Sequence, residues 1–144
     1  IETSIGVDRM VLQVLSAGYQ EEKLENGEER TVLSIPAPLA PVKAAVLPLV
    51  KKDGLPEIAH RIKNTLRYDY NIQYDEKDSI GKRYRRQDAI GTPLCITIDH
   101  QSAEDGTVTV RDRDTMRQER VHIEAIPALV ESKAGMRALL DKLA

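Results

Sequence analysis

Tryptophan and phenylalanine are absent from this chain of 144 residues, and tyrosine supplies all five of its aromatic side chains. The hydrophobic core must therefore be built from Val, Ile, Leu and Ala. A single cysteine excludes an internal disulfide framework and fits a reducing compartment. No stretch approaches the roughly 20 apolar residues that a membrane span needs. The net charge of −2 excludes a generally basic nucleic-acid binder, so any affinity for nucleic acid must come from local patches.

Residues that could carry catalysis are also scarce. The three histidines (His60, His100 and His122) are scattered without ligand spacing, so we expect no metal site. A glycine-rich phosphate loop and a nucleophile elbow are both missing. Cys95 lies in an apolar run and is predicted to be a buried core residue and not a nucleophile. Residues 40–144 therefore have the character of a binding module.

The first third of the chain divides into three segments. Apolar residues at helical spacing predict an amphipathic helix over residues 6–18. The glutamate-rich segment 19–31, with the turn signal Asn26-Gly27, predicts an exposed hairpin or loop. Three prolines in residues 34–41 predict an extended, semi-rigid linker. The chain starts at Ile1 within a pattern and without an initiator Met, as expected of a fragment.

The remaining residues alternate between strand and helix patterns. Strands are predicted at residues 42–49, 71–74, 94–99, 107–111 and 117–123. Helices are predicted from Pro56, from a cap at Ser79, and from Pro127 through Leu143. Alternation of this kind favours parallel strands with right-handed crossovers, finished here by an antiparallel hairpin. The predicted fold is α/β: a mixed five-stranded sheet flanked by three helices, preceded by a strand-helix piece at the N-terminus.

The helix that starts near Ser79 is strongly basic. Lys82, Arg83, Arg85 and Arg86 spread over one side of a helical wheel, opposite an apolar seam that contains Tyr84. A dense basic face with a small apolar seam suits a polyanion, and phosphate backbones are the commonest such partner. The alternative is a solvated helix face without a partner.

A second arginine cluster occupies the predicted hairpin. Arg111, Arg113, Arg117 and Arg120 alternate with acidic residues there. This pattern fits an arginine fork for bases and phosphates, held rigid by carboxylates. The alternative is a hairpin with ordinary cross-strand ion pairs. Because sequential elements are usually neighbours, we expect both clusters to share one surface.

The opening residues place polar groups at a strand-to-helix junction. Glu2 and Ser4 share a face if the segment is extended, Gly6 ends the strand, and Arg9 falls in the first helical turn. An arginine beside a helix N-terminus makes a good phosphate site.

Four stretches together carry a family resemblance: residues 2–10, 37–48, 81–91 and 109–120. The first resembles the third signature motif of class II aminoacyl-tRNA synthetases. The others resemble the anticodon-binding domain of the glycyl-tRNA synthetase family, homodimeric type. The resemblance implies a C-terminal fragment with three parts: a catalytic-domain remnant over residues 1–33, a linker over 34–41, and an anticodon-binding domain over 42–144.

The resemblance also implies roles for residues. Arg9 matches an arginine that binds ATP, and Glu2 and Ser4 match residues of the glycine pocket. Thr3 departs from the family, which usually has proline there. The parent would be a cytoplasmic, homodimeric glycine–tRNA ligase that uses ATP, Mg²⁺ and glycine, binds tRNA(Gly) and is not associated with a membrane. The residues expected to bind tRNA are Lys82, Arg83, Arg85, Arg86, Arg111, Arg113 and Arg117.

The chain alone is expected to bind tRNA without catalysis, because the first two signature motifs are absent. One alternative is a non-catalytic accessory or regulatory RNA-binding domain that reuses the same fold. Residues 1–10 argue against it, since an accessory domain needs no glycine and ATP half-site. An independent doubly wound enzyme is disfavoured because the expected strand ends carry no cluster of acid, base and nucleophile.

Overall fold

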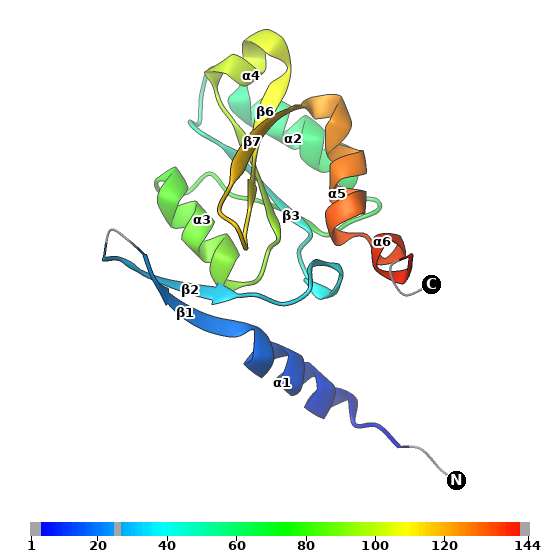
Figure 1. Cartoon of the computed structure of the whole chain (residues 1–144). Helices are drawn as coiled ribbons and strands as arrows, with labels where there is room; N and C mark the ends of the chain where they lie inside the picture. Colours follow the sequence, from blue (N-terminus) through cyan, green and yellow to red (C-terminus); the bar gives the residue numbers. More distant parts are fainter. Residues whose placement is uncertain (1–3, 25–26, 142–144) are drawn as a thin grey trace.

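The computed structural model describes residues 4–24 and 27–141. Its centre is a mixed sheet in the order β4-β3-β5-β6-β7 (Figure 1). The strands are β3 (Ala44–Pro48), β4 (Ile72–Tyr74), β5 (Leu94–Ile98), β6 (Thr107–Asp112) and β7 (Gln118–His122). β3 pairs parallel with β4 and β5, whereas β5, β6 and β7 pair antiparallel. The predicted five-stranded mixed sheet is therefore confirmed.

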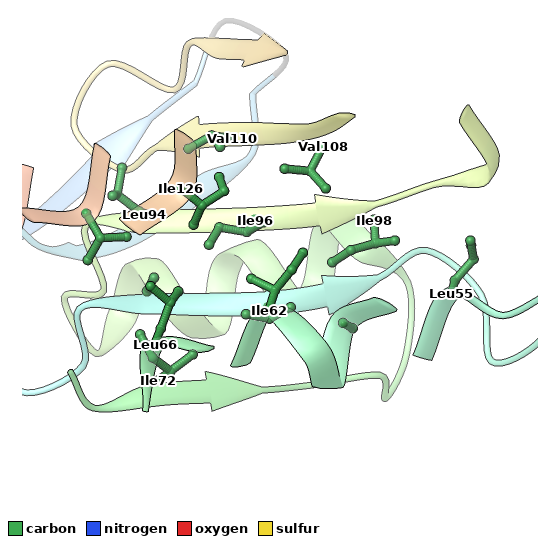
Figure 2. Packing of buried hydrophobic residues seen from close by; sticks show 14 residues of the cluster. Leu55, Ile62, Leu66, Ile72, Leu94, Ile96, Ile98, Val108, Val110 and Ile126 are labelled. Atoms are coloured by element: carbon green, nitrogen blue, oxygen red, sulfur yellow. The ribbon is translucent and has the colours of Figure 1, made fainter. Parts of the chain in front are cut away.

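Helices cover both faces of the central strands. Every residue of β3 and β5 is buried, as the continuous apolar runs of these strands require. On one face α2 (Leu55–Leu66) and α5 (Ile126–Ala134) pack over the larger aliphatic cluster, where Ile62 and Ile126 approach Ile96 (Figure 2). On the other face α3 (Ile80–Ala89) packs Ile80 and Tyr84 against a smaller cluster that includes Cys95. The predicted apolar seam of the basic helix and the burial of Cys95 are thus both confirmed.

Two of the helix predictions need correction. A short helix that was not predicted, α4 (His100–Asp105), begins at a reciprocal capping box between Asp99 and Ser102. The single final helix predicted from Pro127 is wrong, because α5 ends at Ala134 and a separate α6 (Met136–Leu140) follows. In the described part of the chain five helices, not three, therefore accompany the sheet, together with a 3-10 turn, η2 (Ile123–Ala125).

The N-terminal hairpin lies against the α3 side of the body. α1 (Val7–Gly18) leads directly into β1 (Tyr19–Lys23), which pairs antiparallel with β2 (Glu29–Leu33) to form a hairpin under α3 (Figure 1). The prediction of a hairpin over residues 19–31 is confirmed, because β1 and β2 pair antiparallel. The proline-rich segment contains a 3-10 turn, η1 (Ala37–Leu39), and is not a free spacer, because Ile35 and Ala40 are buried.

α1 itself makes little contact with the body. Its apolar residues Val7, Met10, Val11 and Leu15 are all exposed, at 41% or more of their surface. None of the helices in the described part of the chain is long and apolar enough to cross a membrane.

Candidate nucleic-acid interface

A groove lies between the N-terminal half of α3 and the β1–β2 hairpin. Its volume is about 620 Å³. The lining residues are Glu28, Glu29, Ser79, Gly81, Lys82, Tyr84, Arg85 and Arg111. Cations from both predicted clusters therefore meet at one surface, with an aromatic ring between them.

The four cations of α3 have different environments. Lys82 is exposed, and Arg85 is partly exposed and donates from Nη2 to Glu28 Oε2 at 3.0 Å. Arg86 is turned toward Asp75 and Asp78, to which it donates at 2.7–3.1 Å. These carboxylates raise the pKa of Arg86. Of these four cations of α3, Lys82 and Arg85 line the groove, and Arg83 and Arg86 do not.

Arg83 contradicts the expectation that all four cations face solvent. Its side chain is 3% exposed, and Nη1 donates to the carbonyl of Pro48 at 2.6 Å and to that of Asp75 at 3.3 Å. Nη2 donates to the carbonyl of Leu49. Arg83 therefore donates to carbonyl groups where the chain leaves β3 and β4, and it ties the two strand ends to α3.

The hairpin cluster is also less exposed than predicted. Arg113 is 2% exposed and donates to the carbonyls of Gly91 and Ile35, both at 2.8 Å. Arg117 is exposed but lines a different depression, beside Leu129 of α5 on the opposite face of the sheet. The prediction of one shared surface therefore holds for Arg111 and is wrong for Arg113 and Arg117.

Arg111 forms the floor of the groove. It is 5% exposed, and its guanidinium lies over the ring of Tyr84 with 4.8 Å between Cζ and the ring centroid. Nη1 and Nη2 donate to the two carboxylate oxygens of Asp88 at 2.8 and 3.0 Å. Burial raises the pKa of Tyr84, whose hydroxyl lies 2.7 Å from that of Thr97. The floor is therefore a rigid assembly of guanidinium, carboxylate and phenol.

Asp88 and Arg30 were missed by sequence reasoning. Asp88 is completely buried, and its Oδ2 also accepts from Nε of Arg30, which is 1% exposed. Burial lowers the pKa of Arg30, but the hydrogen bonds and charges of Asp88 and Glu22 outweigh this and leave it raised. The available signal was a lone arginine directly after Glu28 and Glu29 in the hairpin sequence, which indicates no partner by itself.

A polar strip extends across the sheet beside the groove. The register of β6 and β7 places Thr107, Thr109 and Arg111 on the same face as His122, Arg120 and Gln118. Arg120 donates to both oxygens of Asp99 at 2.7 and 2.9 Å, and these bonds are the main reason that the pKa of Asp99 is lowered to about 2. Hydroxyl, amide and guanidinium groups of this strip can all hydrogen-bond to a nucleic acid.

The predicted half-site at the start of the chain is described only in part. Glu2 lies outside the described residues. Ser4 is exposed and belongs to no helix or strand, so the expected strand is not found over residues 4–6. Arg9 is exposed and stands in the first turn of α1, as predicted.

Within residues 4–24 and 27–141, no group of three or more His, Cys, Asp or Glu side chains is arranged to hold a metal ion. Burial raises the pKa of the Cys95 thiol to about 12, so this side chain is not a nucleophile at neutral pH.

Solved structures with the same fold come from tRNA synthetases. The prolyl-tRNA synthetase of Cryptosporidium parvum, complexed with L-proline and AMP, superposes with a TM-score of 0.64 at 19% identity over 78% of this chain and 30% of its own. The RNA-binding domain of threonyl-tRNA synthetase from Cryptosporidium parvum Iowa II gives 0.63 at 25% identity, over 70% of this chain and 26% of its own. These likenesses support the fold.

Sequence relatives and a family model give closer matches. The glycine–tRNA ligase of Geobacillus kaustophilus is 55% identical over 133 residues, which cover 92% of this chain and 28% of the relative. That of Rhodopirellula baltica is 50% identical over 137 residues, which cover 92% and 26%. The chain thus spans between a quarter and a third of the length of these relatives. The family model described as "Anticodon binding domain" matches residues 43–133, which include the whole five-stranded sheet and the three cations that line the groove, and the chain therefore belongs to the anticodon-binding domain family.

Proposed function

We propose that this chain is the C-terminal part of a glycine–tRNA ligase and that its groove binds the anticodon arm of tRNA(Gly). The observation that carries the proposal is the meeting of Lys82, Arg85 and Arg111 around Tyr84 in one groove, in a chain that is 50–55% identical to glycine–tRNA ligases. Cations beside an aromatic ring are what a single-stranded loop with unstacked bases requires.

The groove cations divide into two kinds. Lys82 is exposed, and Arg85 is paired with an exposed carboxylate, so both can exchange their present surroundings for phosphate oxygens. Arg111 is fixed by Asp88 and presents an edge at the groove floor. We assign phosphate contacts to Lys82 and Arg85 and a base-facing position to Arg111.

The other predicted tRNA ligands have different proposed roles. Arg86 and Arg117 are exposed outside the groove lining and could contact only more distant parts of the tRNA. Arg83 and Arg113 are buried and donate to backbone carbonyls, so we propose that they support the interface from within.

For the full-length protein we propose glycine activation with ATP, followed by transfer to tRNA. Arg9 would bind ATP, and Glu2 and Ser4 would bind glycine. Mg²⁺ would be held by ATP and by residues outside this chain, because the described residues offer no cluster of carboxylates. A homodimer in the cytoplasm, with residues 1–33 belonging to the catalytic domain and 34–41 joining it to the anticodon-binding domain, completes the proposal.

Binding of an anticodon stem-loop of tRNA(Gly) tests the groove. Lys82→Ala should weaken binding and reduce the slope of log K against log salt concentration by about one. Arg61→Ala is the matched control, since Arg61 is exposed on α2, on the far side of the sheet. Fluorescence anisotropy across a salt series measures the affinity and the salt slope of each variant. Equal behaviour of the two variants would refute the groove as the binding surface.

Pyrophosphate exchange tests the whole-protein proposal. The full-length protein should exchange pyrophosphate in a glycine-dependent way, and this chain alone should not, because adenylation needs phosphate, metal and amino-acid contacts held together. The accessory-domain alternative predicts no exchange from either. It is not favoured, since the relatives that match 92% of the chain carry the name glycine–tRNA ligase.

A further inference from the structure

One buried carboxylate joins the groove to the N-terminal hairpin. Asp88 is fully buried and accepts from Arg111, which forms the groove floor, and from Arg30, which belongs to β2. Arg30 and Asp88 are 58 residues apart in sequence, yet Nε and Oδ2 are 2.8 Å apart. The alternating charges continue to Glu22 of β1, whose Oε2 lies 2.7 Å from Nη1 of Arg30.

Arg30 binds three different elements with its three nitrogens. Nε donates to Asp88 on α3, Nη1 donates to Glu22 on the neighbouring strand, and Nη2 donates to the carbonyl of Arg113 just after β6. A planar guanidinium can make these three bonds in fixed directions at once. The single ammonium of lysine cannot reproduce them.

The position of the β1–β2 hairpin on the body of the protein determines the direction of α1. α1 ends at Gly18 and β1 begins at Tyr19, with no residue between them (Figure 1). Gly18 is itself packed tightly, because a Cβ there would lie 2.7 Å from Ile35 Cγ2. α1 makes few contacts of its own with the body, and most of its apolar residues are exposed. Among the described residues of this chain, the hairpin bonds are therefore the main restraint on the direction of α1.

We infer that Arg30 is a positioning residue: it fixes the direction of α1, and with it the segment that carries Arg9, relative to the RNA groove. The inference rests on the proposed function. A ligase that holds the anticodon arm in the groove must present the far end of the same tRNA to its active site. A displacement of about 1 Å at a reacting centre can cost about a hundredfold in rate. The bonds of Arg30 are placed to prevent such a displacement.

The test uses the full-length protein with two variants. Arg30→Met removes the three bonds and leaves the bidentate pair between Asp88 and Arg111, so the groove floor keeps its counter-ion. Arg30→Lys keeps a cation beside Asp88 and serves if the methionine variant fails to fold. Lys133→Met is the matched control, because Lys133 on α5 forms a 2.9 Å ion pair with Asp112 away from the groove.

Three measurements separate positioning from a general structural role. Both Arg30 variants should lower kcat for tRNA charging by about tenfold or more. Glycine-dependent pyrophosphate exchange and the Kd for the anticodon stem-loop should stay within about twofold of wild type, because neither depends on how the active site is placed relative to the RNA groove. The control variant should match wild type in all three.

Each other outcome overturns the inference in its own way. Unchanged kcat in both Arg30 variants would show that the direction of α1 does not depend on Arg30. Loss of stem-loop binding in parallel with kcat would show that Arg30 acts through the groove floor instead. If the wild-type protein charges no tRNA with glycine, the proposed function itself is refuted. This outcome is distinct from failure of the inference about Arg30, because it is seen in the wild type and not in the variants.

Discussion

Replacing Asp88 with Asn should destabilise the protein strongly. Both carboxylate oxygens are occupied: Oδ1 accepts from Arg111, and Oδ2 accepts from Arg111 and Arg30. Whichever oxygen becomes an amide nitrogen, a donor then faces at least one guanidinium donor. The variant also leaves two buried arginines with one fewer anion. Removing one partner of a buried ion pair lowers the free energy of unfolding by about 3–5 kcal/mol. Because asparagine keeps one oxygen as an acceptor, we expect a loss near the lower end of this range.

Thermal unfolding measures the effect. For a chain of this size about 3 kcal/mol corresponds to a fall in Tm of about 10 °C. Asp78→Asn is the matched acid-to-amide control, because its ion pair with Arg86 is at the surface, where the carboxylate is 39% exposed. An exposed pair contributes only about 0–1 kcal/mol, so the control should lose at most a few degrees. Equal losses in the two variants would refute the reasoning.

A double variant tests the cause of the loss. Adding Arg30→Met to Asp88→Asn removes one of the two uncompensated guanidinium charges. The double variant should therefore be more stable than the sum of the two single losses predicts, since residues that share a network are not additive. Strict additivity would show that the buried charges do not interact, contrary to the 2.8 Å contact between Arg30 and Asp88.

Three further predictions concern other parts of the fold. The folded-state pKa of Asp99 is about 2, below the 3.8 of an unperturbed carboxyl, so its contribution of up to about 2 kcal/mol is present above pH 4 and is lost as pH falls through about 2. Asp99→Asn should therefore lose less stability between pH 4 and pH 2 than wild type in denaturant titrations, and an unchanged pH dependence would contradict the role of its bonds to Arg120. The Cys95 thiol, buried and with a pKa of about 12, should react with a thiol reagent only after denaturation, and rapid labelling of the folded protein would contradict this placement. Gly91→Ala should cost about 2 kcal/mol, because φ is +81° and the added Cβ would lie 2.9 Å from the carbonyl oxygen of Leu33; a Tm equal to that of wild type would argue against this backbone geometry.

The sheet was predictable because its strands carry their own signals. β3 and β5 are buried on both faces, so their sequences are continuous apolar runs, and the first residues of β6 alternate as a half-buried strand does. The break between α5 and α6 was not predictable from periodicity. Gly135 adopts an extended conformation, and a Cβ there would lie 2.5 Å from the carbonyl oxygen of Glu131. The close approach that requires glycine at this point is visible only in three dimensions.

The groove was predictable only in part, for a related reason. Charge density along the sequence showed where cations are concentrated, and three of them do line the groove. It could not show which cations are buried, because burial depends on acceptors far away in the sequence: Pro48 for Arg83, and Asp88 for Arg111. A helical wheel separates apolar from charged positions. It does not reveal that a long arginine can extend its stem under the helix to reach a strand end.

The burial of Arg111 changes what the groove can contribute to recognition. A free lysine such as Lys82 loses side-chain entropy when it binds a ligand, and its attraction to phosphate is weakened by salt. The guanidinium of Arg111 is already immobilised by Asp88 and Tyr84, so presenting its edge to a ligand costs little further entropy. Its charge is already paired with the buried carboxylate of Asp88, so it adds little to counter-ion release, and the N–H groups that Asp88 does not occupy remain to contact a base. In the proposed complex, salt dependence should therefore report on Lys82 and Arg85, whereas discrimination between anticodons should depend on Arg111.

Arg111→Lys should keep the salt slope and lose the discrimination, as measured by competition between stem-loops with altered anticodons. A changed slope with discrimination intact would assign Arg111 to phosphate instead.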